Sequence, residues 1–192
     1  MGLPERVKAL NDRRWPWQVL LRSWQTHVGV FLLLAAGAVN AQWQIDKVLD
    51  GDSIVLRDRN GQRLSVRLAG IDAPERGQAF ADRSRQNLRN LTTNCTPEWI
   101  FQKIDRYGRS IGLIFCDGRD LGQAQLETGL AWHFSRYAKE QPFEQRTAYL
   151  NAQLRAQRAG IGLWRDAEPM PPWSFREQRR GIRANQTRVQ NN

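Results

Sequence analysis

The sequence predicts an α+β fold, in which five short strands form a small Greek-key β-barrel and three helices pack around it. Three observations predict this class. Segments with strand periodicity begin soon after residue 42, and Asn60-Gly61 between two of them is typical of a tight hairpin turn. Helical periodicity appears after the third strand and again near the end. A chain of 192 residues with 41% apolar residues has room for one modest core.

The five expected strands are rich in β-branched residues or alternate apolar with polar positions, as half-buried strands do. Asn60-Gly61 joins the second strand to the third, and Tyr107-Gly108 lies between the fourth and the fifth. The strands are expected at residues 44–49, 53–57, 63–68, 99–104 and 110–115.

The three expected helices have recognisable faces or ends. Ser84, Leu88 and Leu91 share one face of the first helix at helical spacing. Gly129 is a suitable terminator for the second, and Pro142 is a favourable first-turn residue for the third. The helices are expected at residues 78–91, 121–128 and 142–159.

The first 41 residues are expected to be an export signal rather than part of the fold. Arginines precede an apolar run at residues 28–41, and Val39 and Ala41 resemble the −3 and −1 positions of a cleavage site. The run is 14 residues long, whereas a helix needs about 20 to cross a bilayer. We therefore expect a periplasmic or secreted protein. An uncleaved membrane anchor is the alternative, because tryptophans upstream of the run suit a membrane interface.

The chain is strongly basic, with 29 Lys and Arg against 19 Asp and Glu and a formal net charge of +10. Such an excess favours an anionic partner such as a polyphosphate backbone, although a merely solvated surface is an equal alternative. The folded domain is expected at residues 42–168. Residues 169–192 form a basic, apolar-poor tail that we expect to be disordered, with either non-specific affinity for the partner or no role.

Cys95 and Cys116 are the only two cysteines. They lie at the outer ends of the fourth and fifth expected strands, which a hairpin would bring together. In an oxidising compartment we expect them to form a disulfide, worth about 3 kcal/mol in the chain-entropy model. Two buried free thiols are the alternative. With no CxxC spacing and only two histidines, a structural zinc site is not expected.

Three charged motifs carry candidate chemistry. In Asp50-Gly51-Asp52-Ser53, the two carboxylates are two positions apart, so on an extended chain both can approach one cation. The second motif is Arg67-Leu68-Ala69-Gly70-Ile71-Asp72-Ala73-Pro74-Glu75, and the third is Asp105-Arg106-Tyr107-Gly108-Arg109. Taken singly, the first and third are better explained as turns.

The second motif is more informative. Arg67 can fork two oxygens of one phosphate, and Pro74 keeps Ala73 extended, so Asp72 can bind a metal while Glu75 faces a neighbouring water. An Arg67–Asp72 salt bridge at a strand end, with Glu75 merely exposed, is an equal alternative. Hard oxygen ligands, a spare carboxylate and guanidinium groups together are what metal-assisted cleavage of a phosphodiester requires.

The motifs together resemble the staphylococcal nuclease (thermonuclease) family. The matching strings are VLDGDSIVL, VRLAGIDAPE, DRYGRSIG, ETGLAW and GIGLW. The resemblance implies a five-stranded oligonucleotide-binding barrel (OB fold) with three helices. It also implies a calcium-dependent nuclease that cleaves DNA and RNA, preferably single-stranded, and leaves 3′-phosphates. No obligate protein partner is implied, and a membrane is involved only if the amino-terminal segment is uncleaved.

The resemblance assigns metal-binding roles to four residues. Asp52 and Asp72 correspond to the calcium-binding carboxylates. Ala73 stands where the family offers a backbone carbonyl to the ion, and Asp50 corresponds to an acid beside the ligands that does not itself touch the ion.

The resemblance also implies that Glu75 is the general base and that Arg67 and Arg109 bind the phosphate. Tyr137 is the aromatic residue expected to be exposed for base stacking, and His133 is expected to be structural. A non-hydrolytic interaction module on the same barrel is the rival interpretation. The complete set of charged residues argues against it.

Overall fold

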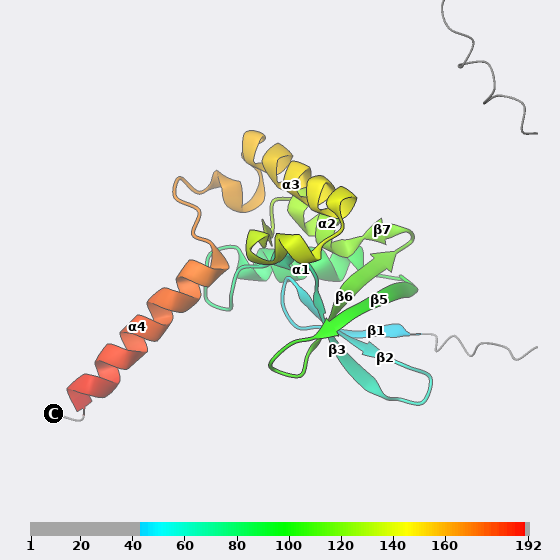
Figure 1. The fold of residues 1–192 in the computed structure, drawn as a ribbon, viewed down its shortest axis with the longest axis horizontal. Coiled ribbons are helices and arrows are strands. Elements are labelled where there is room, and N and C mark those ends of the chain that lie inside the picture. Colours follow the sequence, from blue (N-terminus) through cyan, green and yellow to red (C-terminus); the bar gives the residue numbers. More distant parts are fainter. Residues whose placement is uncertain (1–42, 191–192) are drawn as a thin grey trace, which may run out of the picture. The chain divides into compact units, whose positions relative to one another are not determined.

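The computed structural model describes residues 43–190, which form an α+β domain (Figure 1). Five strands are hydrogen-bonded in the order β1-β2-β3-β6-β5, and β7 (Arg119–Asp120) pairs with β6 at one end. All pairs are antiparallel except β3 with β6. The five strands are β1 (Gln44–Val48), β2 (Ser53–Arg57), β3 (Arg63–Leu68), β5 (Pro97–Ile104) and β6 (Ser110–Cys116).

A second, two-stranded sheet joins β4 (Ile71–Asp72) to β8 (Trp132–His133). Because β4 follows β3 after a tight turn at Gly70 (φ 73°), this pairing holds the end of β3 in place beside the helical layer. Two 3₁₀ turns also occur, over Ser135–Glu140 and Gly162–Arg165. The α-helices are α1 (Ala81–Leu91), α2 (Leu121–Glu127), α3 (Phe143–Arg158) and α4 (Pro172–Gln190).

The predicted α+β class is confirmed, and the five main strands lie where the sequence placed them. The expected closed barrel is not reproduced by the hydrogen bonding, since within residues 43–190 no ladder joins β1 to β5. The sheet is instead a mixed one with β1 and β5 at its edges. The predicted number of helices is wrong, because this part of the chain has four α-helices rather than three.

The core lies between the sheet and helices α1, α2 and α3. Alternate residues of β2 and β3 point into it, which explains the strand periodicity in the sequence. The Cys95–Cys116 disulfide expected from the sequence is present and ties the segment after α1 to the end of β6. The fully buried aliphatic residues of the core are Ile54, Leu56, Val66, Leu68, Ile71, Leu88, Ile114, Leu121 and Leu126.

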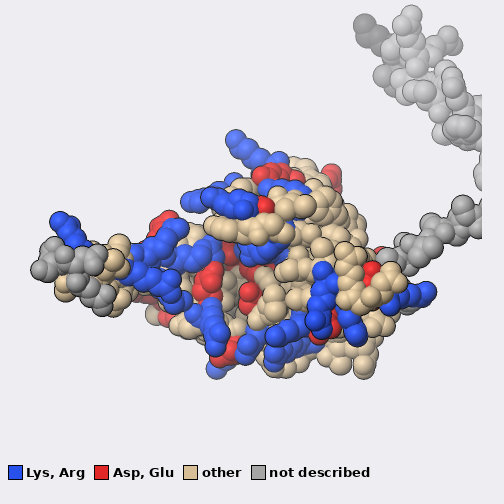
Figure 2. All heavy atoms as spheres, turned by 90° about the horizontal axis from the view of Figure 1, so that it is seen from below, with Lys and Arg blue, Asp and Glu red and all other residues tan. Residues whose placement is uncertain are grey.

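Helix α4 differs from the expectation of a disordered tail. Its arginines and glutamines are good helix formers even though they offer little to a core. An aromatic cluster holds its first turn, where Trp173 stacks on Phe134 with ring centroids 5.6 Å apart and meets the edge of Trp132 at 5.7 Å. Figure 2 shows basic side chains gathered on the α4 side of the molecule, around a smaller group of acidic ones.

No helix within residues 43–190 is long and apolar enough to cross a membrane. The predicted export signal, its cleavage site and the alternative membrane anchor all lie outside the described residues.

Candidate active site

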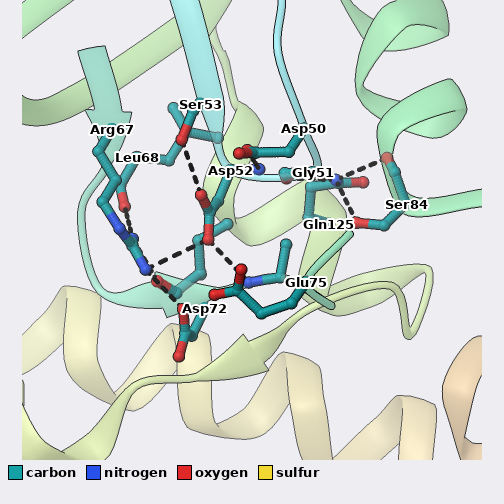
Figure 3. Close-up of polar contacts among 12 residues, drawn as sticks. Asp50, Gly51, Asp52, Ser53, Arg67, Leu68, Asp72, Glu75, Ser84 and Gln125 are labelled. Carbon is teal, nitrogen blue, oxygen red and sulfur yellow. Dashed lines mark hydrogen bonds and ion pairs between the residues drawn. The ribbon is translucent and has the colours of Figure 1, made fainter. Parts of the chain in front are cut away.

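The Asp50-Gly51-Asp52 loop connects β1 to β2 and packs against helices α1 and α2. A Cβ on Gly51 would lie 1.9 Å from the Ser84 hydroxyl of α1, so only glycine fits there. Gln125 of α2 donates from Nε2 to the Gly51 carbonyl (2.6 Å) and to the Ser84 carbonyl (3.0 Å). The loop that carries the two aspartates is therefore fixed by buried polar side chains (Figure 3).

Arg67, at the end of β3, draws two carboxylates together. Its Nη2 lies 3.2 Å from Oδ2 of Asp52 and 2.6 Å from Oδ1 of Asp72. Its Nη1 donates to the Ile71 carbonyl at 2.9 Å, and the Ala73 amide donates to Oδ2 of Asp52 at 2.8 Å. Because both aspartates contact the same nitrogen, the Asp50–Ser53 loop and the Arg67–Glu75 segment converge at one place, as Figure 3 shows.

The carboxylates of this site lie close together in a poorly solvated place. Burial first, and next the neighbouring charge of Asp52, raise the pKa of Asp50 to about 6. Burial also raises the pKa of Asp72, against the lowering effect of Arg176 and Arg67. Carboxylates that resist ionisation because they crowd one another in a poorly solvated place favour a bound cation.

The structure adds a residue that the sequence analysis missed. Arg176 of α4 pairs with Asp72 through Nη2 (2.7 Å) and with Glu75 through Nη1 (2.5 Å). These two carboxylates raise the pKa of Arg176 despite its partial burial. Arg176 lies 104 positions from Asp72, in the segment expected to be disordered. The only sequence signal was the helical spacing of the arginines that follow it.

In Figure 3 the Glu75 side chain reaches toward Asp52, and it is only partly exposed to solvent. Its backbone amide donates to Oε1 of Gln78, which fixes the loop after Pro74. The expected general base therefore lies beside the expected metal ligands, with Arg176 as its present partner.

The structure does not bring Arg109 to the carboxylates. Arg109 precedes β6, the neighbour of the strand that carries Arg67, but within residues 43–190 its ion pair is with Asp105 (2.7 Å). Its guanidinium also lies over the Tyr107 ring at 5.6 Å. Arg109 is thus held by its own turn, on the strand next to the site.

Most of the aromatic side chains near the site are packed against other side chains. Trp132 and Phe134 belong to the cluster that holds α4. Tyr137 is 38% exposed, with the Lys103 ammonium over its ring at 4.9 Å. His133 is buried and its Nε2 is hydrogen-bonded to Gln141 at 2.9 Å.

The oxygen atoms gathered in this site meet part of what a hard cation requires of its ligands. Asp52 and Asp72 offer carboxylate oxygens at one point, next to the backbone of Ala73. Over residues 43–190, however, no three His, Cys, Asp or Glu side chains form a ready metal cluster. The site therefore fits an ion that takes two carboxylates and completes its coordination with a backbone carbonyl and water.

Comparison with known proteins finds relatives of one family. A family model described as staphylococcal nuclease homologue matches residues 65–166, more than half of the chain. The chain is 38% identical over 143 residues to a micrococcal nuclease of Shigella flexneri, covering 69% of this chain and 79% of the relative. It is 32% identical over 135 residues to a Haemophilus influenzae protein named an uncharacterized endonuclease, covering 70% and 72%.

A more distant relative is a staphylococcal-like nuclease of Arabidopsis thaliana, 30% identical over 120 residues that make up 62% of this chain and 35% of the relative. The residues matched by the family model include Arg67, Asp72 and Glu75, whereas Arg176 lies beyond them. The chain therefore belongs to the staphylococcal nuclease family, and it is a nuclease, a hydrolase of phosphodiester bonds.

Proposed function

We propose that the enzyme is calcium-dependent and sugar-non-specific, and that it cleaves both DNA and RNA to leave 3′-phosphate ends. One observation carries the proposal: Arg67 brings Asp52 and Asp72 to a single point, with Glu75 beside them. In this proposal the five main strands form the partly open barrel of an OB fold, with the site on its nucleic-acid-binding face.

The residues that would hold Ca²⁺ are Asp52 and Asp72 through their carboxylates and Ala73 through its carbonyl, with Asp50 adding negative charge nearby. Bound there, the ion supplies Lewis-acid polarisation of the phosphate and a template for its orientation. The chain's own task is to keep these oxygens together, which the loop contacts of Gly51 and the fork of Arg67 achieve.

The charged side chains have complementary roles in hydrolysis. Glu75 accepts a proton from the attacking water on a carboxylate oxygen. The water oxygen bonds to phosphorus as the P–O5′ bond breaks, and the leaving 5′ oxygen takes up a proton from solvent. Arg67 stays charged at any working pH. Once its Nη2 exchanges Asp52 and Asp72 for the phosphate, it donates hydrogen bonds to the phosphoryl oxygens as their negative charge increases. Arg109 supplies a second guanidinium after exchanging its contact with Asp105 for the substrate phosphate.

Substrate selection follows from contacts to phosphates and base faces rather than base edges. Phosphate contacts carry no sequence information, and a partly exposed Tyr137 can stack on any base. Single-stranded or unstacked substrate is preferred, since its bases are free to stack. Export to the periplasm or the medium completes the proposal and is consistent with the disulfide.

The decisive experiment measures cleavage of single-stranded DNA and RNA by the purified protein. We expect cleavage to stop with a calcium chelator, to return with added calcium, and to fall strongly in Glu75→Gln. Cleavage that persists in chelator would refute the calcium requirement. Nucleic-acid binding with no cleavage under any divalent ion would favour the interaction-module alternative instead.

A further inference from the structure

Four arginines of α4 form one continuous face that starts in the active site. Arg176, Arg179, Arg180 and Arg183 are spaced as i, i+3, i+4 and i+7, so they share one side of the helix. We call this set the arginine face. With a rise of about 1.5 Å per residue, it extends about 10 Å along the helix axis. All of it beyond Arg176 is exposed.

The arginine face is fixed to the site at its first member. Arg176 contacts Asp72 and Glu75, and Arg179 donates to the carbonyl of Arg76, the residue after Glu75. Gln78 also donates to the Met170 carbonyl just before α4, at 2.7 Å. The start of α4 therefore lies along the loop that carries Glu75.

The charge at the outer end of this face forms no ion pair within the part of the chain that the structure describes. Ion pairs there involve Arg176, but none is found for Arg180 or Arg183. Like charges at i, i+3 and i+4 disfavour a helix by a few tenths of a kcal/mol per pair. A row of exposed, mutually repelling guanidiniums suggests a polyanion partner.

We propose that the arginine face binds the phosphate backbone of the nucleic-acid substrate and leads the strand into the active site. This inference rests on the proposed nuclease function and adds a substrate-binding element that lies outside the matched family domain. At about 3.4 Å per nucleotide along one strand, the face spans about three phosphates. Arg176 is its innermost contact and exchanges a site carboxylate for a substrate phosphate.

Arginine–phosphate contacts predict a measurable salt dependence. On single strands, log K falls with log salt by about 0.7 for each phosphate neutralised. We would compare the full-length wild type with R179Q/R180Q/R183Q by fluorescence anisotropy on a labelled single-stranded 20-mer, in chelator, over a series of KCl concentrations. The matched control is R146Q/R155Q/R158Q, which removes the same charge from α3.

We expect the α4 variant to lose about 2 from the salt slope and at least tenfold in affinity at low salt. The α3 control variant should keep most of the wild-type salt slope and most of the wild-type affinity. In the calcium-loaded cleavage assay, KM should rise in the α4 variant while kcat changes little, because none of the three residues touches the site carboxylates. Circular dichroism should be unchanged and the melting temperature nearly so, because all three side chains are exposed and the bond from Arg179 to the Arg76 carbonyl is a long, exposed one of 3.4 Å.

The outcomes separate this inference from the proposed function. A wild type that neither binds nor cleaves nucleic acid contradicts both. A wild type that cleaves, with the α4 variant and the control equal in salt slope and KM, overturns the arginine face alone, since net charge would then explain binding.

Discussion

Replacing Gln125 tests whether α2 holds the aspartate loop in place. Gln125 is fully buried, and its Nε2 donates to the carbonyls of Gly51 and Ser84 while its Oε1 accepts from Asn87 at 2.6 Å. Methionine has a similar volume but donates no hydrogen bond. In Gln125→Met the Gly51 carbonyl loses its partner, and a buried acceptor without one costs about 1–3 kcal/mol.

Because the contacts of Gln125 with Ser84 and Asn87 are also lost, we expect the free energy of unfolding, measured in urea, to fall by about 2–4 kcal/mol. Asn87 keeps a second acceptor in Thr128, at 3.2 Å, which limits the loss. We also expect kcat/KM to fall, because the loop that positions Asp52 loosens. The control is Gln123→Met on the same helix, whose side chain bonds Glu127 one turn away and should cost less than about 0.5 kcal/mol. Equal stability of the two variants would show that Gln125 does not support the loop.

Two further predictions concern the site arginine and the disulfide. Arg67→Lys keeps the charge but loses the planar fork that contacts Asp52 and Asp72 and would bind a phosphate. We expect kcat to fall about 100-fold or more, with little change in substrate affinity. A kcat near that of wild type would contradict the role of Arg67 in stabilising the transition state. Reductant should lower the melting temperature, since the Cys95–Cys116 bridge spans 21 positions and is worth about 3 kcal/mol. Cys95→Ser/Cys116→Ser, the control, should not respond to reductant, and an unresponsive wild type would show that the bridge adds no stability.

Local sequence patterns predicted most of the fold because each strand and helix carries its own signal. The alternation of β2 and β3 reports one buried face, and Asn60-Gly61 marks their turn, where Gly61 has a φ of 82°. Closure of the sheet has no such local signal, and the hydrogen bonds end at β1 and β5. The helical state of α4 was missed since its polar composition resembles that of a disordered segment.

The sequence predicted which charged residues lie together in the site, but not the residues that hold them in place. Asp52 and Asp72 were candidate metal ligands because their motifs resemble those of a known family, and the structure brings both carboxylates to Arg67. Gln125 and Ser84 are ordinary helix residues whose role exists only when α1 and α2 meet the aspartate loop. Arg176 is a stronger example, since its partners are about a hundred positions away and the contacts of Trp173 and Gln78 with distant segments bring it there.

The charge balance of the site supports the proposed cation beside its two arginines. Asp50, Asp52, Asp72 and Glu75 offer four carboxylates, and Arg67 and Arg176 offset two of them. The remaining two negative charges match one divalent ion. Burial, and next the charge of Asp52, raise the pKa of Asp50, so its carboxylate is the most easily protonated of the four when no cation offsets its charge. An arriving phosphate adds negative charge, which Arg176 can meet once an ion takes over its place on Asp72. Helix α4, which carries Arg176, would then contribute directly to substrate binding in the site.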